Sequence, residues 1–203
     1  QVKKNAIENS ASTTKLIEQN MKELSETLEF YQVAINSDTR IHLDLITTLG
    51  NTKSNHQNTT IFNQTLQNLY YSQCTKPYIQ SMFLTIEGSP YFINGLTCEK
   101  FENSVDHTWI SDAQNNDAST FFKVRHVKRN KFDTVTMPVV TVYHKIKYQE
   151  LLAINLRQDY FNQWLDSITN YNGQILLISD KDGQLLFHNS NAYFPTSDPA
   201  LLL

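Results

Sequence analysis

Two runs of alternating residues, at positions 140–146 and 152–156, constrain the fold of this chain most. Alternation with period two places every second side chain on the same face of a β-strand. In the first run the more apolar face carries Val140, Val142, His144 and Ile146, and the other face carries Thr141, Tyr143 and Lys145. The second run repeats the pattern with Leu152, Ile154 and Leu156. A short polar segment separates the runs, so the sequence predicts two antiparallel strands joined by a turn.

A helix is predicted after the second strand, beginning at about Asp159. Its apolar residues recur at spacings of three and four positions, as Tyr160, Phe161, Trp164, Leu165 and Ile168. This spacing gathers them on one broad side of a helix. We therefore expect this helix to lie against the sheet.

The first fifty residues predict one long helix, because they contain no Pro and no Gly before Gly50. Apolar residues form a seam with heptad spacing, in steps of four and three positions: Ile17, Met21, Leu24, Leu28, Tyr31 and Ile35. Either the helix packs on its own domain, or a second copy of the same helix covers the seam in a homodimer. Beyond Ile35 a different apolar stripe begins, as though the helix exchanged a partner helix for its own sheet.

Further elements are predicted between the long helix and the paired strands. A polar loop at 50–60 leads into a second helix at 61–72. Strands at 79–86 and 91–96 flank a turn with the sequence Glu-Gly-Ser-Pro. A short helix at 109–114 and a strand at 119–128 follow. Together these elements predict an α+β fold with a long N-terminal helix and an antiparallel sheet.

Composition and charge exclude some classes of function. The 203 residues are 40% hydrophobic, which suffices for a packed core in one large or two small domains. A formal charge of −3 and a pI near 6.1 give no basic field that could hold nucleic acid. No apolar run is long enough to span a bilayer. The chain begins without Met and ends soon after a predicted strand, and we expect it to be a piece of a longer protein.

Sequence motifs for metal binding and catalysis are missing. The six histidines never approach one another at a ligand spacing, and no Cys-x-x-Cys pair occurs. There is no Gly-x-Ser-x-Gly elbow, no Gly-rich phosphate loop and no kinase signature. We therefore expect no metal site, no cofactor and no catalytic residue in this chain.

The paired strands, the amphipathic helix after them and the long N-terminal helix resemble the membrane-distal module of Cache domains. Cache domains are extracellular, PAS-like sensor domains of bacterial receptors. The stretch 173–189 (GQILLISDKDGQLLFHN) resembles the opening hairpin of a second, membrane-proximal Cache module. The likeness is strongest to the ectodomains of YesM-type sensor histidine kinases. It implies a long helix at 1–50, a distal module at 51–170 and an incomplete proximal module at 171–203.

The resemblance also implies a ligand pocket. Residues 107–113 (HTWISDA) are similar to the Arg-x-Trp-Tyr-x-x-Ala segment with which one Cache subfamily holds the carboxylate and amine of amino acids. Trp109 and Ala113 match, but His107 replaces the Arg, so the fixed cation that fits a carboxylate is missing. The candidate ligand-binding residues are Trp109, His107, Tyr91, Lys123, Arg125 and Tyr143. In the alternative interpretation Trp109 anchors the core and Arg125 is a surface charge.

Two cysteines, Cys74 and Cys98, bracket the predicted hairpin at 79–96. An even number of cysteines in an extracellular domain allows a disulfide between the start of one strand and the end of the next. The alternative is a pair of buried thiols. The residues leave both alternatives open.

The function implied by the resemblance is ligand sensing on the extracellular face of a bacterial cell membrane. The full-length protein would be a membrane-anchored sensor histidine kinase of a two-component system, homodimeric through the N-terminal helix, that responds to a small molecule. A chemotaxis receptor or a cyclase receptor with the same ectodomain is an alternative. A coiled-coil adaptor that binds another protein is a second alternative, from a different class.

Overall fold

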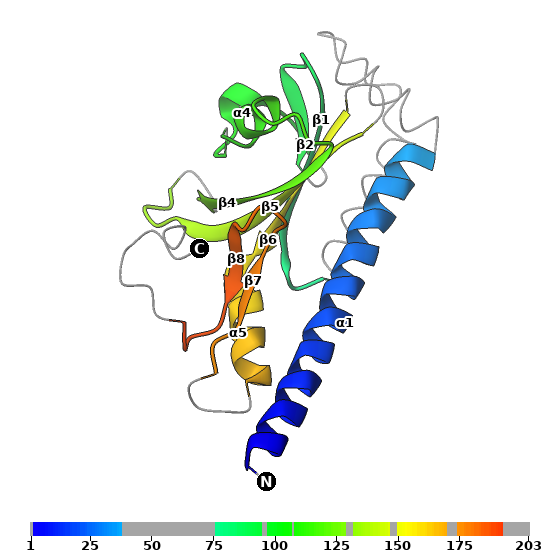
Figure 1. The fold of residues 1–203 in the computed structure, drawn as a ribbon. Coiled ribbons are helices and arrows are strands. Elements are labelled where there is room, and N and C mark those ends of the chain that lie inside the picture. Colours follow the sequence, from blue (N-terminus) through cyan, green and yellow to red (C-terminus); the bar gives the residue numbers. More distant parts are fainter. Residues whose placement is uncertain are drawn as a thin grey trace. The chain divides into compact units, whose positions relative to one another are not determined.

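The computed structural model describes residues 2–37, 76–94, 97–106, 108–128, 132–146, 150–169 and 174–192 (Figure 1). The chain divides into two compact units. One unit is formed by Gln1–Tyr31 together with Asp159–Leu203, and the other by Gln32–Gln158. The domain ranges proposed from the sequence, 1–50, 51–170 and 171–203, stay a prediction.

The unit Gln32–Gln158 holds a six-stranded antiparallel sheet with the strand order β3-β2-β1-β6-β5-β4. Its strands are β1 (Ile79–Ile86), β2 (Tyr91–Asn94), β3 (Thr97–Lys100), β4 (Thr120–Val127), β5 (Met137–Lys145) and β6 (Glu150–Arg157). A short 3-10 helix, η1 (Phe101–Asn103), and the helix α4 (Thr108–Gln114) connect β3 to β4. This architecture confirms the predicted α+β fold, in which a long N-terminal helix precedes an antiparallel sheet.

The register between strands divides the side chains into two faces, because alternate residues of a strand point to opposite sides. On one face lie two rows of paired residues: Ser81, Asn155, Thr141 and Lys123, then Phe83, Ala153, Tyr143 and Phe121. The rows on the opposite face are Met82, Ile154, Val142 and Phe122, then Leu84, Leu152, His144 and Thr120. We call the first the polar face and the second the aliphatic face.

The two strands predicted from alternating residues, β5 and β6, lie next to each other inside the sheet. Every residue at 139–144 and at 150–156 is buried, so both faces of these strands are covered. Burial on both faces means that polar residues of these strands need hydrogen-bond partners inside the protein. Thr141 and Asn155 partner each other, since the Thr141 hydroxyl donates to Asn155 Oδ1 at 2.6 Å.

Two local features of β1 shape the polar face. β1 ends in the predicted turn, where Gly88 has a φ of 78°, a conformation that costs glycine little and other residues more. Near the start of β1 the register slips between Ile79 and Ser81, which makes Gln80 the extra residue of a β-bulge. The bulge interrupts the alternation, and the neighbours Gln80 and Ser81 line the same hollow as a result.

The other unit holds most of α1 (Val2–Ser37), nearly all of α5 (Gln158–Ile168) and a two-stranded sheet of β7 (Leu177–Ser179) and β8 (Leu185–His188). The hairpin predicted in 173–189 is confirmed, and the N–H of Gly183 donates to the Asp180 carbonyl at 3.2 Å in its turn. α5 packs on this hairpin. The rings of Phe161 and Phe187 have centroids 4.4 Å apart, and Asn162 Oδ1 accepts the N–H of His188 at 3.0 Å.

The predicted dimer seam lies on α1, which is described as far as Ser37; its predicted continuation to residue 50 lies outside the described residues. Leu24, Leu28 and Tyr31 are buried in the single chain, whereas Ile17 and Met21 are half-buried. The side chain of Ile35 is outside the described set. Pairing of two copies through this seam stays a prediction.

None of the helices that the structure describes is both long and apolar enough to cross a membrane.

Cys98 lies on the edge strand β3 as a free, exposed thiol. Cys74 lies outside the described residues, so the candidate disulfide stays a prediction.

Candidate ligand-binding site

Helix α4 covers part of the polar face and is held there by an aromatic cluster. Trp109 is fully buried and stacks on Phe83 of β1 with ring centroids 5.3 Å apart. The same indole contacts the rings of Phe92 and Phe101, at centroid distances of 6.0 and 5.7 Å. Ala113, one turn later in α4, belongs to the same buried cluster. Trp109 is therefore a core anchor, and its contact with a ligand stays a prediction.

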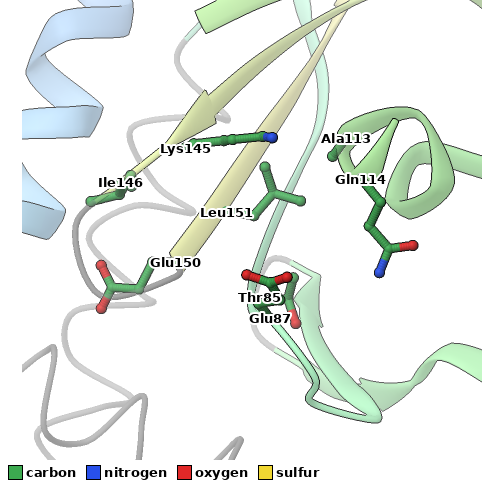
Figure 2. Close-up of a pocket in the computed structure, with 8 residues that line it drawn as sticks. All are labelled: Thr85, Glu87, Ala113, Gln114, Lys145, Ile146, Glu150 and Leu151. Atoms are coloured by element: carbon green, nitrogen blue, oxygen red, sulfur yellow. The ribbon is translucent and has the colours of Figure 1, made fainter. Parts of the chain in front are cut away.

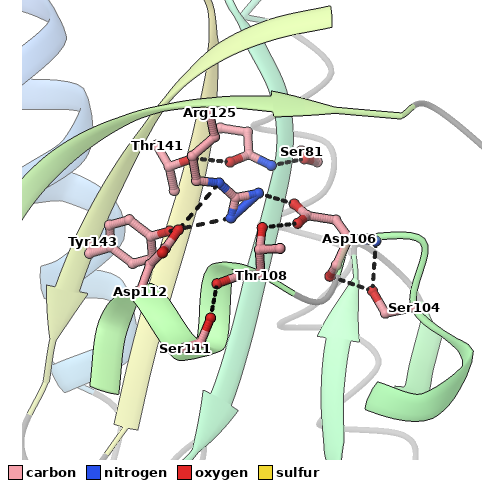
Figure 3. Close-up of polar contacts among 10 residues, drawn as sticks. Ser81, Ser104, Asp106, Thr108, Ser111, Asp112, Arg125, Thr141 and Tyr143 are labelled. Atoms are coloured by element: carbon pink, nitrogen blue, oxygen red, sulfur yellow. Dashed lines mark hydrogen bonds and ion pairs between the residues drawn. The ribbon is translucent and has the colours of Figure 1, made fainter. Parts of the chain in front are cut away.

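Arg125 of β4 is the centre of a charge network between α4 and the sheet (Figure 3). Its Nη2 pairs with Asp106, its Nη1 donates to the Tyr143 hydroxyl at 3.2 Å, and its Nε lies 3.9 Å from Asp112 Oδ2. The Tyr143 hydroxyl donates to the same Asp112 oxygen at 3.3 Å, and Lys123 Nζ pairs with Asp112 Oδ1 at 2.5 Å. We call these five residues the Arg125 network.

Both carboxylates of the network come from the segment that carries α4. Asp106 precedes the helix, and Asp112 is a residue of the helix itself. The Ser104 hydroxyl accepts the N–H of Asp106 at 3.2 Å and donates to the Asp106 carbonyl at 2.7 Å, which holds the backbone of this turn. The Thr108 hydroxyl donates to Asp106 Oδ1 at 3.3 Å. The network therefore ties α4 and the turn before it to β4 and β5.

Burial decides the electrostatics of the network. The side chain of Arg125 is only 4% exposed, so it is not the surface charge of the alternative interpretation, and a buried charge needs partners. Asp106 and Asp112 balance the two cations, Arg125 and Lys123. Burial is also the largest influence on Tyr143 and raises its pKa well above the usual range, although Arg125 opposes this shift. The Tyr143 hydroxyl consequently keeps its proton and can donate to Asp112.

A hollow of about 250 Å³ opens beside the network on the polar face. Residues of β1, of β6, of the turn at 104–106 and of the end of β4 line it, among them Ser81, Phe83, Asp106, Lys128 and Asn155. Phe83 is the ring on which Trp109 stacks, and Asp106 is the carboxylate that pairs with Arg125. The aromatic cluster and the charge network thus each support one wall of this cavity, which we call the Ser81 hollow.

A chain of hydrogen bonds runs along the polar face to the Ser81 hollow (Figure 3). Thr141 is fully buried, and Asn155 Oδ1 is the acceptor for its hydroxyl proton. The amide nitrogen of Asn155 then donates to Ser81 Oγ at 2.9 Å. Because Ser81 accepts this hydrogen bond, its own proton remains to be donated, and no acceptor for it occurs among the described residues. Ser81 therefore presents an oriented donor to the hollow.

A second hollow, of about 160 Å³, lies at the C-terminal end of α4 (Figure 2). It is lined by Thr85, Glu87, Ala113, Gln114, Lys145, Ile146, Glu150 and Leu151. Two of its donor groups are engaged within the protein: the Thr85 hydroxyl donates to the Tyr91 carbonyl at 2.7 Å, and Lys145 Nζ donates to the Asn116 carbonyl. The amide of Gln114 belongs to an exposed residue. The Ser81 hollow is larger and has a donor that buried partners orient, so it is the better candidate for a ligand.

The structure brings three of the six predicted ligand residues, Lys123, Arg125 and Tyr143, into the Arg125 network. Trp109 stacks on Phe83 and is not among the residues that line the Ser81 hollow. Tyr91 begins β2, where it pairs with Lys100 of β3. His107 lies outside the described residues. Whether any of the six contacts a ligand stays a prediction.

The sequence interpretation did not single out Asp106, Asp112, Ser81 and Asn155. The two aspartates had a signal, because Asp112 lies within the segment 107–113 that resembles a ligand-binding motif and Asp106 directly precedes that segment. Ser81 and Asn155 had none, because they meet across a sequence separation of 74 residues, and their pairing depends on a strand register that one sequence does not supply. The bulge at Gln80 hides the alternation of β1 further.

No protein-family model matches the chain, and no curated protein does. Two of the solved structures that resemble it are sensory domains. One is the domain of a putative sensory box/GGDEF family protein from Vibrio parahaemolyticus, with 14% identity over 80% of this chain and 63% of that one, at a TM-score of 0.48. This chain thus spans less than two thirds of that structure.

The other is the sensory domain of the Campylobacter jejuni chemoreceptor Tlp3 with isoleucine bound, with 12% identity over 87% of this chain and 73% of that one, at a TM-score of 0.40. At such identities the chemistry of the site has to be argued from this chain's own residues.

Proposed function

We propose that this chain is the extracellular ligand-sensing domain of a bacterial transmembrane receptor whose output is a two-component sensor histidine kinase. The observation that carries the proposal is the Ser81 hollow, where an oriented hydroxyl donor faces a cavity beside a buried and balanced charge network. Small-molecule sites are concave, with apolar walls and a few polar groups in fixed positions. In this proposal the chain binds its ligand and performs no catalysis.

Signalling in this proposal follows from a difference in ligand affinity between two arrangements of a membrane-anchored homodimer. A ligand that binds one arrangement more tightly increases the population of that arrangement. Anchoring holds two copies at high local concentration, so even a weak helix seam would pair. Ile17 and Met21, the half-buried heptad residues of α1, would contribute to that seam, since Leu24, Leu28 and Tyr31 are already buried in the single chain. A shift of the paired helices would carry the signal inward.

The binding part of the proposal is tested by a thermal-shift screen with a hollow-filling variant as the control. Val105 lines the hollow, and Val105→Trp should fill it. A ligand present at 100 times its Kd should add about 2.7 kcal/mol to the wild type and little to this variant. Val135→Trp is the matched control, because Val135 is 77% exposed in a loop and does not line the hollow. A ligand that stabilises wild type and Val105→Trp equally would place binding elsewhere.

The receptor part is tested with the full-length protein in membrane vesicles. A ligand found in the screen should change the rate of autophosphorylation, and Val105→Trp should remove that change. A full-length protein without membrane segments on either side of these residues would refute the receptor proposal while leaving ligand binding intact.

A further inference from the structure

The charges around the Ser81 hollow are already balanced. The guanidinium of Arg125 contacts Asp106, Asp112 and Tyr143, so an anionic ligand would have to displace a carboxylate from a buried cation. A cationic ligand finds Asp106 already paired with Arg125. The other charged residues that line the hollow are Glu99 and Lys128, one of each sign. Lys128 is exposed, where water and salt weaken its attraction for an anion.

The uncharged groups of the hollow combine donors, acceptors and an apolar wall. Ser81 presents a donor that Thr141 and Asn155 orient. Gln80, which the β-bulge places beside it, carries an amide that can both donate and accept. The ring of Phe83 supplies an apolar surface that Trp109 holds from behind. A hydroxyl group matches such a mixed set, because it donates one hydrogen bond and accepts others.

From this balance we infer that the Ser81 hollow binds a small, uncharged ligand with several hydroxyl groups, of the polyol or monosaccharide class. The inference rests on the proposed sensing function and gives the class of ligand for the same site. The ligand's hydroxyls accept from Ser81 and exchange hydrogen bonds with Gln80, and its C–H face lies on Phe83. The Arg125 network stays intact when the ligand binds and acts as a rigid, neutral wall.

The inference is tested by isothermal titration of the folded chain with four kinds of probe. These are neutral polyols and sugars (myo-inositol, xylose and glucose), carboxylates (succinate), diamines (putrescine) and zwitterions (alanine). A member of the neutral group should bind, and its Kd should not change with ionic strength, because an uncharged ligand has no Coulomb attraction to screen. Binding only by succinate, putrescine or alanine would overturn the inferred class.

Two variants separate the class of ligand from the existence of the site. Ser81→Ala removes the oriented donor and should weaken the neutral ligand about three- to tenfold. Ser111→Ala is its matched control, because the Ser111 hydroxyl is exposed and bonds its own helix at the Thr108 carbonyl. With Lys128→Gln the Kd of the neutral ligand should stay independent of ionic strength, whereas an anionic ligand would bind this variant more weakly than the wild type.

The outcomes distinguish failure of the inference from failure of the proposed function. Binding by a charged probe that Ser81→Ala weakens leaves the sensing proposal standing and overturns the neutral class. Binding by a sugar that Ser81→Ala and Ser111→Ala affect equally overturns the inferred role of the hollow. Absence of binding by every neutral probe to the folded chain overturns the inferred class, whereas the sensing proposal fails only if the thermal-shift screen also finds no ligand that Val105→Trp affects.

Discussion

The two faces of the six-stranded sheet are built from alternate residues of the same strands, yet the buried side chains on them are stabilised in different ways. On the aliphatic face Val142, Ile154 and Leu156 are fully buried and need only close packing. On the polar face Arg125, Thr141 and Asn155 are equally inaccessible, and each requires specific partners. Apolar burial suffices to hold a sheet together. The polar groups therefore add a constraint that folding does not require.

The buried ion pairs of the Arg125 network show that polar groups on this face are costly to bury. Desolvation of an ion pair costs free energy that the attraction between its members only partly offsets, so a buried pair is weak support for stability. What such a network supplies is a fixed arrangement of side chains, which a binding site needs. The contrast between the faces therefore points to the polar face as the one that carries the function.

The largest effect is expected when the Arg125 network loses its central cation. Arg125→Met keeps much of the volume but leaves Asp106 buried without its cation and Asp112 with Lys123 alone, and it should lower the free energy of unfolding by about 3–5 kcal/mol. Chemical denaturation measures this change. Adding Asp106→Asn should restore much of the loss, because the uncompensated carboxylate is then gone, while Asp112 keeps its ion pair with Lys123. A loss of under about 1 kcal/mol for the single variant would contradict a structural role for the network.

A smaller effect is expected when the network loses one hydroxyl. Tyr143→Phe removes the acceptor for Arg125 Nη1 and the donor to Asp112, and it should destabilise the fold by about 1–3 kcal/mol. Tyr91→Phe is the matched control, because no partner of the Tyr91 hydroxyl occurs among the described residues, and it should be nearly neutral. Equal losses for the two variants would show that the network contributes nothing beyond ring burial.

A conservative substitution on the aliphatic face should lower the free energy of unfolding by less than the changes in the Arg125 network. Ile154→Val removes one methylene from a fully buried side chain and should cost about 0.5–1.5 kcal/mol. The same denaturation experiment measures it. Ligand affinity at the Ser81 hollow should stay unchanged, since Ile154 points away from the polar face. A loss of affinity with this variant would mean that the two faces are coupled.

The strands were predictable to the extent that their residues alternate or are apolar. The runs around Val142 and Ile154 were sufficient to predict β5 and β6, and the Gly88 turn was sufficient for β1 and β2. β3 was missed, because its four residues, Thr97–Lys100, carry no apolar pattern, and the predicted strand was drawn to residue 96 instead of ending at Asn94. A short edge strand gains its place through pairing with β2, which local sequence does not reveal.

The site was predictable only in part, for a related reason. Lys123, Arg125 and Tyr143 could be proposed as a group because they lie on neighbouring strands at polar positions. Their balance by Asp106 and Asp112 could not, since it depends on how the turn at 104–106 and α4 fold back over the sheet. The sequence segment around Trp109 suggested an amino-acid site without its cation. The structure instead has a buried cation, Arg125, whose guanidinium already pairs with Asp106 and donates to the Tyr143 hydroxyl.

The smallest effect concerns the one buried imidazole on the described part of the aliphatic face. His144 is buried in a row with Leu84, Leu152 and Thr120, none of which titrates, and its Nδ1 lies 2.9 Å from the Thr120 hydroxyl. Burial lowers the pKa of His144 below its usual value, because the charged form loses its hydration. Its Nε2 has no hydrogen-bond partner among the described residues, and both ring nitrogens carry protons in the charged form, so that form would bury an N–H without an acceptor.

The sign of the pH effect follows from proton counting. Between the lowered pKa of the folded state and the usual value near 6.5, the unfolded chain binds more protons than the folded chain, so stability rises with pH in this window. The contribution is fully present above about pH 6.5 and is lost as the pH falls through the folded pKa. His144→Gln does not titrate, so its unfolding free energy should fall less than that of the wild type between neutral and mildly acidic pH. Parallel pH profiles for the two proteins would show that His144 contributes nothing to the pH dependence of stability, and the contrast with the charge network on the polar face would become sharper still.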